Sequence, residues 1–294
     1  MVRDEPATAH PASTVVLLRD GGAPRTGLEA FLLQRPGGAS FMAHAHVFPG
    51  GRVEADDLDR RWEARCAGAD AVRRPWRDTA TPEALLAHAV AAVRELFEEA
   101  GVLLARDTSG RMLSGGSADT EPALRDARTA LEAGTRFHEV CEPRGWQLAL
   151  DLLAPLAHWV TPATEPRRFD TRFYLAELPA GQRATACGRE TVAGDWVTPA
   201  DALARHARGE ITLAPPTHRT LDDLDGCTSA EMARNLAAGV AYVRIEPHVH
   251  REGDETWLLL PGDPLYPAPP GAGLRPPTRF VAAGRHRFVP LRDS

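Results

Sequence analysis

Three glutamates crowd the segment RELFEEAGV, which begins at Arg94, and they are Glu95, Glu98 and Glu99. A helix predicted over residues 82–100 places their side chains within an arc of about 100°. Clustered carboxylate oxygens suit hard divalent cations such as Mg²⁺ or Mn²⁺. The alternative is a solvated acidic face on which Arg94 pairs with Glu98, and spacing alone does not decide between the two.

The predicted helix has clear end signals. Thr81 suits the N-cap, Pro82 the first helical position, and Gly101 the left-handed position after the last turn. The glutamates therefore lie at the C-terminal end, where the helix dipole already places negative charge. A bound cation would offset this repulsion. The opposite side of the helix is an apolar stripe for the core, made of Leu86, Val90, Val93, Phe97 and Ala100.

The full string resembles the second half of the Nudix box, G-x5-E-x7-R-E-U-x-E-E-x-G-U with U aliphatic, at every specified position. The first half is absent where the pattern requires it, because Ala80 replaces the box glycine and Leu86 the box glutamate. The upstream stretch HVFPGGRVEADD resembles this missing first half. In it, Gly51 takes the place of the box glycine and Asp57 takes the place of the acid paired with it.

The box is therefore expected to be split by an insertion at about 58–80. In having a split box, the sequence resembles the Nudix subfamily that includes the mammalian peroxisomal coenzyme A diphosphatase, whose box also carries a long insertion. The resemblance implies an α/β fold, the Nudix α/β/α sandwich with a mixed sheet. It also implies a Nudix hydrolase domain over residues 10–225 and a C-terminal extension over residues 226–294.

The box also implies roles for individual residues. Metal-binding and catalytic roles fall to Glu95, Glu98 and Glu99, with Arg94 orienting them through charge-assisted hydrogen bonds. Asp57 is a further candidate metal ligand, and nearby Glu54 is the alternative. The remaining candidates are Glu190 as general base, Gly50 and Gly51 as close-approach positions in the substrate loop, and Arg35 and Arg168 as phosphate-binding residues.

The activity implied by the resemblance is metal-dependent hydrolysis of a pyrophosphate linkage in a small nucleoside-diphosphate derivative. Coenzyme A or acyl-coenzyme A, cleaved to 3′,5′-ADP and 4′-phosphopantetheine, is the first expectation. Two alternatives stay open. One is a hydrolase of ADP-ribose, dinucleotides or nucleotide sugars, and the other is a Nudix-fold regulator that binds a nucleotide without cleaving it.

Charge and hydropathy exclude some classes of binding partner. The chain has a net charge of −6, and all 34 basic residues are arginine without a basic aromatic cluster, so nucleic acid is not an expected partner. No run of eighteen apolar residues and no signal-peptide core occur, which predicts a cytoplasmic protein without a membrane partner. Four widely spaced cysteines are expected to be reduced. A homodimer stays open.

Patterns along the rest of the chain predict the elements that would position these residues. Strands are expected at 13–18, 28–35, 169–178 and 192–197 from apolar runs and alternation. Helices are expected at 121–137, 145–156 and 199–209. Beyond residue 226 we expect one more helix, two strands and a tail rich in proline and glycine.

Overall fold

The structure is a computed structural model of the 294-residue chain. It describes residues 7–22, 27–37, 44–73, 76, 80–116, 120–188, 193–239, 243–267, 273–284 and 287–291. Within these ranges, no helix has the length and apolar character needed to cross a membrane.

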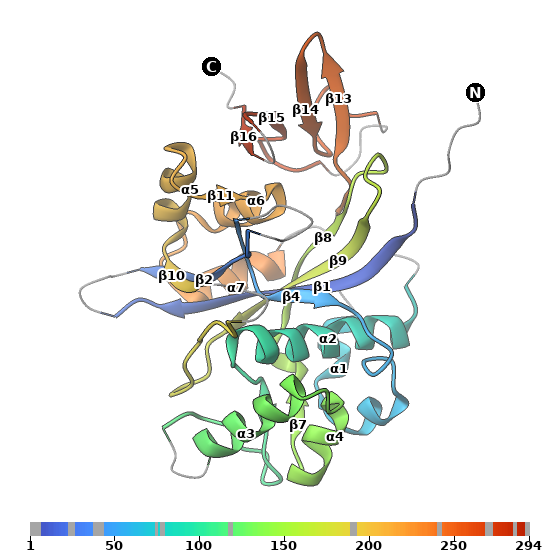
Figure 1. The fold of residues 1–294 in the computed structure, drawn as a ribbon, viewed down its shortest axis with the longest axis vertical. Coiled ribbons are helices and arrows are strands. Elements are labelled where there is room, and N and C mark those ends of the chain that lie inside the picture. Colours follow the sequence, from blue (N-terminus) through green and yellow to red (C-terminus); the bar gives the residue numbers. More distant parts are fainter. Residues whose placement is uncertain are drawn as a thin grey trace.

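A mixed sheet of nine strands forms the centre of the molecule (Figure 1). Its main path is β11 (Thr212–Leu213), β3 (Ala45–Val47), β2 (Leu28–Gln34), β1 (Ala9–Asp20), β9 (Arg168–Glu177), β8 (Ala154–Val160) and β12 (Arg244–Ile245). Two further strands join it, β10 (Ala193–Val197) beside β2 and β4 (Gly50–Arg52) beside β1. β1 is parallel to β9 and antiparallel to β2, so the predicted mixed sheet is confirmed.

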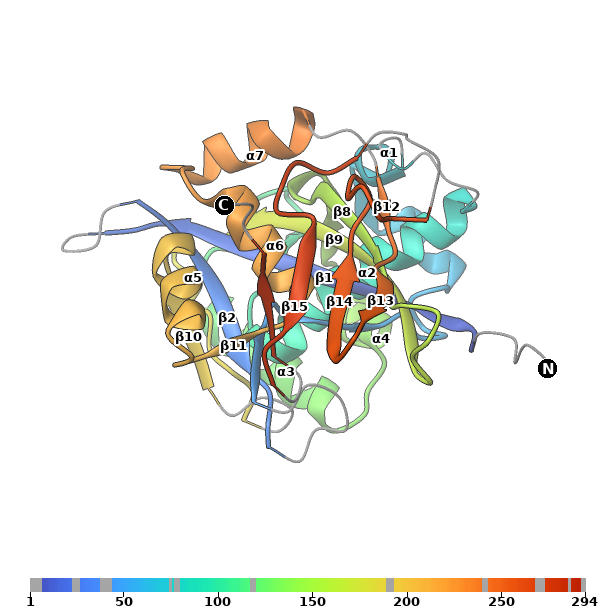
Figure 2. The ribbon, with the colours of Figure 1, turned by 90° about the horizontal axis from the view of Figure 1, so that it is seen from above.

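Helices cover both faces of this sheet (Figures 1 and 2). One layer holds α1 (Ala69–Arg73), α2 (Pro82–Ala100), α3 (Thr120–Glu132) and α4 (Phe137–Cys141). The other holds α5 (Pro199–Ala207), α6 (Pro215–Leu224) and α7 (Ala230–Gly239). Alternation along β1 feeds both layers, because Val15 and Leu17 pack with α2 whereas Val16 and Leu18 pack with the second group. The predicted α/β/α sandwich is confirmed.

Two smaller sheets flank the sandwich. Residues from the first helical layer form a three-stranded sheet of β5 (Cys66–Ala67), β7 (Gln147–Ala149) and β6 (Ala105–Arg106). The C-terminal segment forms a four-stranded antiparallel sheet of β13 (His248–Glu252), β14 (Glu255–Leu259), β15 (Arg279–Ala282) and β16 (Phe288–Pro290). Figure 1 shows this second sheet at the top, on the side of α5 and α6.

The segment expected to split the box is folded and packed. It contains the 3₁₀ helix η1 (Arg60–Ala64), β5 and α1. Trp62 is fully buried, with its ring centroid 5.2 Å from that of Phe137, and Trp76 is 8% exposed. The two aromatic side chains therefore fasten this segment to the core beside α2.

Most of the expected elements are confirmed, and one is wrong. The four predicted strands correspond to β1, β2, β9 and β10, and the helices at 121–137 and 199–209 to α3 and α5. The helix predicted at 145–156 is instead β7, the 3₁₀ helix η3 (Leu150–Leu152) and the start of β8. A short apolar run buried on both sides has no periodicity that separates strand from helix. Helix α6 and the 3₁₀ helix η2 (Glu142–Arg144) were not predicted.

Candidate active site

Helix α2 carries the box glutamates, and its ends are formed as predicted. The Thr81 hydroxyl accepts a 3.2 Å hydrogen bond from the Ala84 N–H, and Gly101 has φ 70° while its N–H donates to the Phe97 carbonyl. Glu95 and Glu99 are only 7% and 9% exposed. The alternative of a solvated acidic face is therefore wrong for these two residues.

Arg94 lies at the centre of the acidic cluster and is 4% exposed. Its Nε and Nη2 donate to the two carboxylate oxygens of Asp57, each at 2.9 Å. Its Nη1 donates to Glu95 at 2.8 Å and to Glu98 at 3.3 Å, while Nη2 also donates to the Arg52 carbonyl at 2.8 Å. One guanidinium thus holds both halves of the split box together.

The two box glycines lie directly against the helix. The Gly50 N–H donates a 2.8 Å hydrogen bond to Glu99 Oε2. A Cβ at Gly51 would overlap the Glu95 carboxylate, so only glycine permits this approach. Pairing of β4 with β1, in which Gly51 lies opposite Ser13, sets the position of the loop. The loop from Gly50 to Asp57 therefore folds back beside the glutamates, as the split-box hypothesis requires.

A buried histidine supports the loop from the other side. His138, on α4, is 1% exposed, and its Nδ1 shares a hydrogen bond with Asp56 Oδ1. The His138 backbone N–H donates to Asp56 Oδ2 at 3.4 Å, and the indole N–H of Trp62 donates to the Asp56 carbonyl at 2.9 Å. Sequence reasoning missed His138, because nothing local to residue 138 indicates a contact with residue 56.

Burial dominates the electrostatics of the cluster. Burial raises the pKa of Glu95 to about 7, Arg94 opposes this change, and the neighbouring Glu98 reinforces it. Burial also raises the pKa of Asp57, against the hydrogen bonds from Arg94. Three carboxylates, those of Asp57, Glu95 and Glu98, contact the single Arg94 guanidinium, and the Glu99 carboxylate lies beside them on the same helix turn. This excess of acidic groups over basic groups favours a further cation.

The donor chemistry fits Mg²⁺ or Mn²⁺, since every candidate ligand offers carboxylate oxygen. Among the three carboxylates bound to Arg94, that of Glu98 is the most exposed, with 35% of its side chain accessible to solvent. In the part of the chain that the structure describes, no three His, Cys, Asp or Glu side chains form a ready group of metal ligands. Hydrogen bonds from Arg94 and Gly50 to the carboxylates account for their present orientation.

The remaining predicted residues lie in different settings. Arg35 directly follows β2, and its buried Nε has no hydrogen-bond partner among the described atoms. Arg168 donates to Glu246 at 2.6 Å and to the carbonyls of Ala7 and Thr161, so its guanidinium is engaged within the chain. This geometry gives no support to a substrate role for Arg168. Glu190 lies outside the described residues.

An apolar cavity beside β8 lies apart from this chemistry. All four cysteines are free, as predicted. The mainly apolar cavity, of about 590 Å³, lies along β8, between Trp76 and α7, and none of its lining residues belongs to the acidic cluster. The candidate active site is therefore identified from its carboxylates and not from the volume of a cavity.

Comparisons with known proteins agree with the geometry. The family model described as the NUDT19 Nudix domain matches residues 9–224, a span that includes both halves of the box. The acyl-coenzyme A diphosphatase NUDT19 of Gallus gallus is 31% identical over 288 residues, covering 82% of this chain and 74% of that protein. Its Homo sapiens counterpart is 29% identical over 313 residues, covering 90% and 82%. A crystal structure of a NUDIX hydrolase from Alicyclobacillus acidocaldarius has 31% identity and a TM-score of 0.61, covering 78% of this chain and 96% of that one.

Proposed function

This chain belongs to the Nudix hydrolases, within the family of the NUDT19 Nudix domain, and from that premise we propose that it hydrolyses coenzyme A or acyl-coenzyme A in a metal-dependent reaction. Water would cleave the pyrophosphate linkage, with a new P–O bond formed to the water oxygen as the P–O–P bridge breaks. The products are 3′,5′-ADP and 4′-phosphopantetheine or its acylated form. Support for this substrate comes from the two relatives named acyl-coenzyme A diphosphatase.

The observation that carries the proposal is the set of carboxylates gathered around Arg94. Glu95, Glu98 and Glu99 would hold Mg²⁺ or Mn²⁺, with Asp57 tied to the same guanidinium. When bound, the cation would neutralise phosphate charge and lower the pKa of the attacking water. Arg94 keeps the carboxylates oriented, and its burial preserves the strength of those hydrogen bonds by excluding solvent.

The loop and its neighbours act on the substrate side of the same site. The absence of a side chain at Gly50 and Gly51 lets backbone approach the carboxylates, which leaves room for a phosphate group beside them. Arg35 is the favoured phosphate-binding arginine, because its buried Nε is not already engaged by a described atom. Glu190 stays a prediction as the general base, and so do a cytoplasmic location and a homodimer.

A substrate panel tests this function. Purified protein is incubated with coenzyme A, acetyl- and long-chain acyl-coenzyme A, ADP-ribose, diadenosine polyphosphates and nucleotide sugars, with Mg²⁺, Mn²⁺ or EDTA, and products are identified by mass. We expect 3′,5′-ADP from the coenzyme A substrates, no turnover in EDTA, and recovery on adding metal. Turnover that persists in EDTA would refute the metal requirement, and cleavage of another class alone would refute the substrate. Protein carrying Glu98→Gln, purified in parallel, controls for contaminating phosphatases.

A further inference from the structure

The last turn of α2 concentrates negative charge, and it contains no positively charged side chain of its own to balance that charge at the helix end. The last carbonyls of a helix, which have no partner within the helix itself, place partial negative charge next to the three box glutamates. Arg94 lies on the side of the turn, with its guanidinium directed at carboxylates rather than at carbonyls. The helix end therefore needs a cation from elsewhere in the fold.

Arg128, on α3, supplies that cation. Its Nη2 donates to the Glu98 carbonyl at 2.9 Å and to the Glu99 carbonyl at 3.3 Å, and its Nε also reaches the Glu98 carbonyl at 3.2 Å. The same guanidinium contacts the Thr185 carbonyl at 3.2 Å and the Thr185 hydroxyl at 3.3 Å. Its side chain is 16% exposed. Arg128 thus joins the end of α2 to the segment after β9.

Two features of the surroundings fit this contact. Leu124 and Ala127 are buried, and their spacing places Arg128 on the same face of α3 toward the core. Gly101 leaves room for the guanidinium, because a Cβ there would lie 2.6 Å from Nη1 of Arg128. Two requirements therefore favour glycine at position 101: the left-handed backbone conformation and the close approach of the arginine.

We propose that Arg128 is a positioning residue for the candidate metal site. It fixes the backbone of Glu98 and Glu99, and so holds their side chains in the arrangement that a divalent cation needs. The described contacts of Arg128 are with the backbone of α2, with Thr185 and, at 3.8 Å, with Glu132, and the residue lies outside the box. This inference rests on the proposed function, since it concerns the same metal site.

Removing Arg128 has two opposing effects on the affinity for a divalent cation, so the direction of the measured change shows which effect prevails. Loss of a positive charge near an acidic site would tighten cation binding, although solvent screening weakens that effect beyond about 8 Å in physiological salt. Loss of the two carbonyl contacts lets the last turn fray and separates the carboxylates, which weakens cation binding. Because the guanidinium contacts the glutamate backbone directly, we expect the second effect to prevail.

Mn²⁺ binding to the full chain without substrate provides the test, with free Mn²⁺ measured by electron paramagnetic resonance. We expect Arg128→Gln to raise the Kd for Mn²⁺ about three- to tenfold. Arg128→Lys keeps the charge but lacks the fork, and should give an intermediate value. With the active wild-type substrate, kcat should fall in the same order while KM stays within about twofold. Arg125→Gln is the matched control, because Arg125 is on the same helix, 68% exposed, and paired only with Glu121 among its described ion pairs.

The outcomes separate this inference from the proposed function. If the wild-type protein binds no Mn²⁺ and cleaves no pyrophosphate compound, the proposed function fails. If the wild type binds Mn²⁺ but Arg128→Gln and Arg128→Lys have an unchanged or lower Kd, only the positioning role fails, even where their melting temperatures drop. Should Arg128→Gln not fold, an unchanged Kd in Arg128→Lys overturns the inference by itself.

Discussion

Residues 94–101 and residues 50–57 meet at Arg94, yet they are held in place by different kinds of contact. The first segment is the end of a nineteen-residue helix with its own N-cap and a left-handed glycine after it. Its apolar residues pack into one continuous core cluster with β1 and β2. Local sequence and burial along the whole helix therefore define where the box glutamates lie.

The second segment has no comparable hydrophobic support. Its short strand β4 pairs with β1 over three residues, and beyond that strand polar contacts hold it. Asp57 is bound by Arg94, Asp56 is bound by His138, and the Asp56 carbonyl accepts from Trp62. A segment fixed by few polar contacts should be sensitive to single changes, whereas the helix should tolerate loss of charge.

The largest effect is expected where the loop meets the helix. Asp57→Asn removes the charge that faces the buried Arg94 through two 2.9 Å hydrogen bonds. Removing one partner of a buried ion pair should lower the free energy of unfolding by about 3 kcal/mol. Chemical denaturation without metal measures this difference. Asp59→Asn is the control, because its pair with Arg61 is at the surface and its loss should leave the midpoint unchanged. Equal midpoints for both variants would show that the loop does not depend on Asp57.

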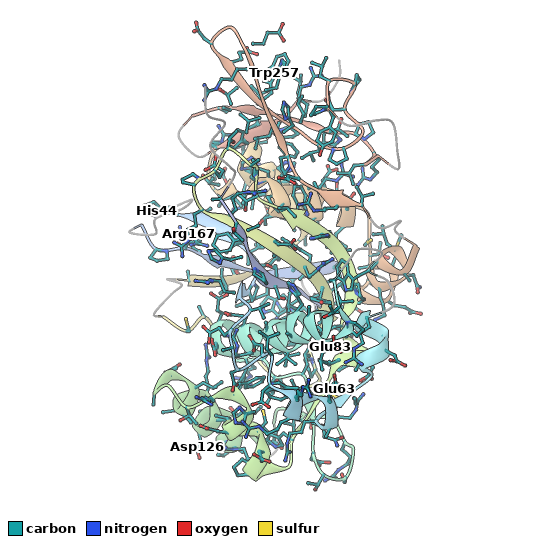
Figure 3. All side chains as sticks on the ribbon, turned by 90° about the vertical axis from the view of Figure 1, so that its right-hand side faces the viewer. His44, Glu63, Glu83, Asp126, Arg167 and Trp257 are labelled. Carbon is teal, nitrogen blue, oxygen red and sulfur yellow. The ribbon has the colours of Figure 1, made fainter. Side chains whose placement is uncertain are left out.

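A change in the helix half should affect turnover rather than folding. Glu98→Gln keeps the shape and removes the charge, so we expect kcat to fall roughly 10²-fold or more, about 2.7 kcal/mol in the barrier. Glu99→Gln should behave alike. Thermal stability without metal should stay level or rise, because repulsion among the glutamates is relieved. Glu83→Gln, at the exposed first turn of α2 (Figure 3), is the control for turnover. Near wild-type kcat in both site variants would remove the box glutamates from catalysis.

The helix half was predictable from sequence because its determinants are local. Thr81, Pro82 and Gly101 mark the ends, and spacing alone places Glu95, Glu98 and Glu99 on one side. The sequence also located Gly51 and Asp57 as the missing half, through resemblance. What it did not provide was the burial of Glu95 and Glu99, which arises from β4 and Arg94 closing over the helix.

The supporting contacts were not predictable for a physical reason. Arg128 and His138 reach the site from α3 and α4, and a single sequence carries no signal for which distant helix packs beside α2. The helix expected at 145–156 was wrong for a related reason, since pairing of β7 with β5 and β6 depends on partners far along the chain. Arg168 was predicted to bind phosphate, but its ion pair with Glu246 depends on the fold of the C-terminal segment, for which the sequence near residue 168 carries no signal.

The smallest effect is expected at the contact that joins the two halves through β1. His88, on α2, is 6% exposed, and its Nδ1 lies 3.0 Å from the Ala12 carbonyl and 3.2 Å from the Ser13 hydroxyl. Ala12 and Ser13 are the β1 residues that pair with Arg52 and Gly51 of β4. A carbonyl only accepts, so Nδ1 carries the hydrogen in this arrangement.

Burial lowers the pKa of His88 to about 4, and the nearby Arg172 lowers it further while Asp170 opposes the change. The unfolded chain, with a histidine pKa of 6.5, therefore binds a proton at a higher pH than the folded chain does. The stability that neutral His88 contributes is complete above pH 6.5 and is lost as the pH falls toward 4. Between pH 7 and pH 5 the loss should be about 2 kcal/mol of unfolding free energy. Glu95, whose pKa is raised to about 7, changes stability in the opposite direction over the same range, so the test is the difference between proteins. On going from pH 7 to pH 5, the wild type and His10→Gln, where the histidine is exposed, should each lose about 2 kcal/mol more unfolding free energy than His88→Gln does. An equal loss in all three proteins would show that His88 does not contribute to the pH dependence of stability.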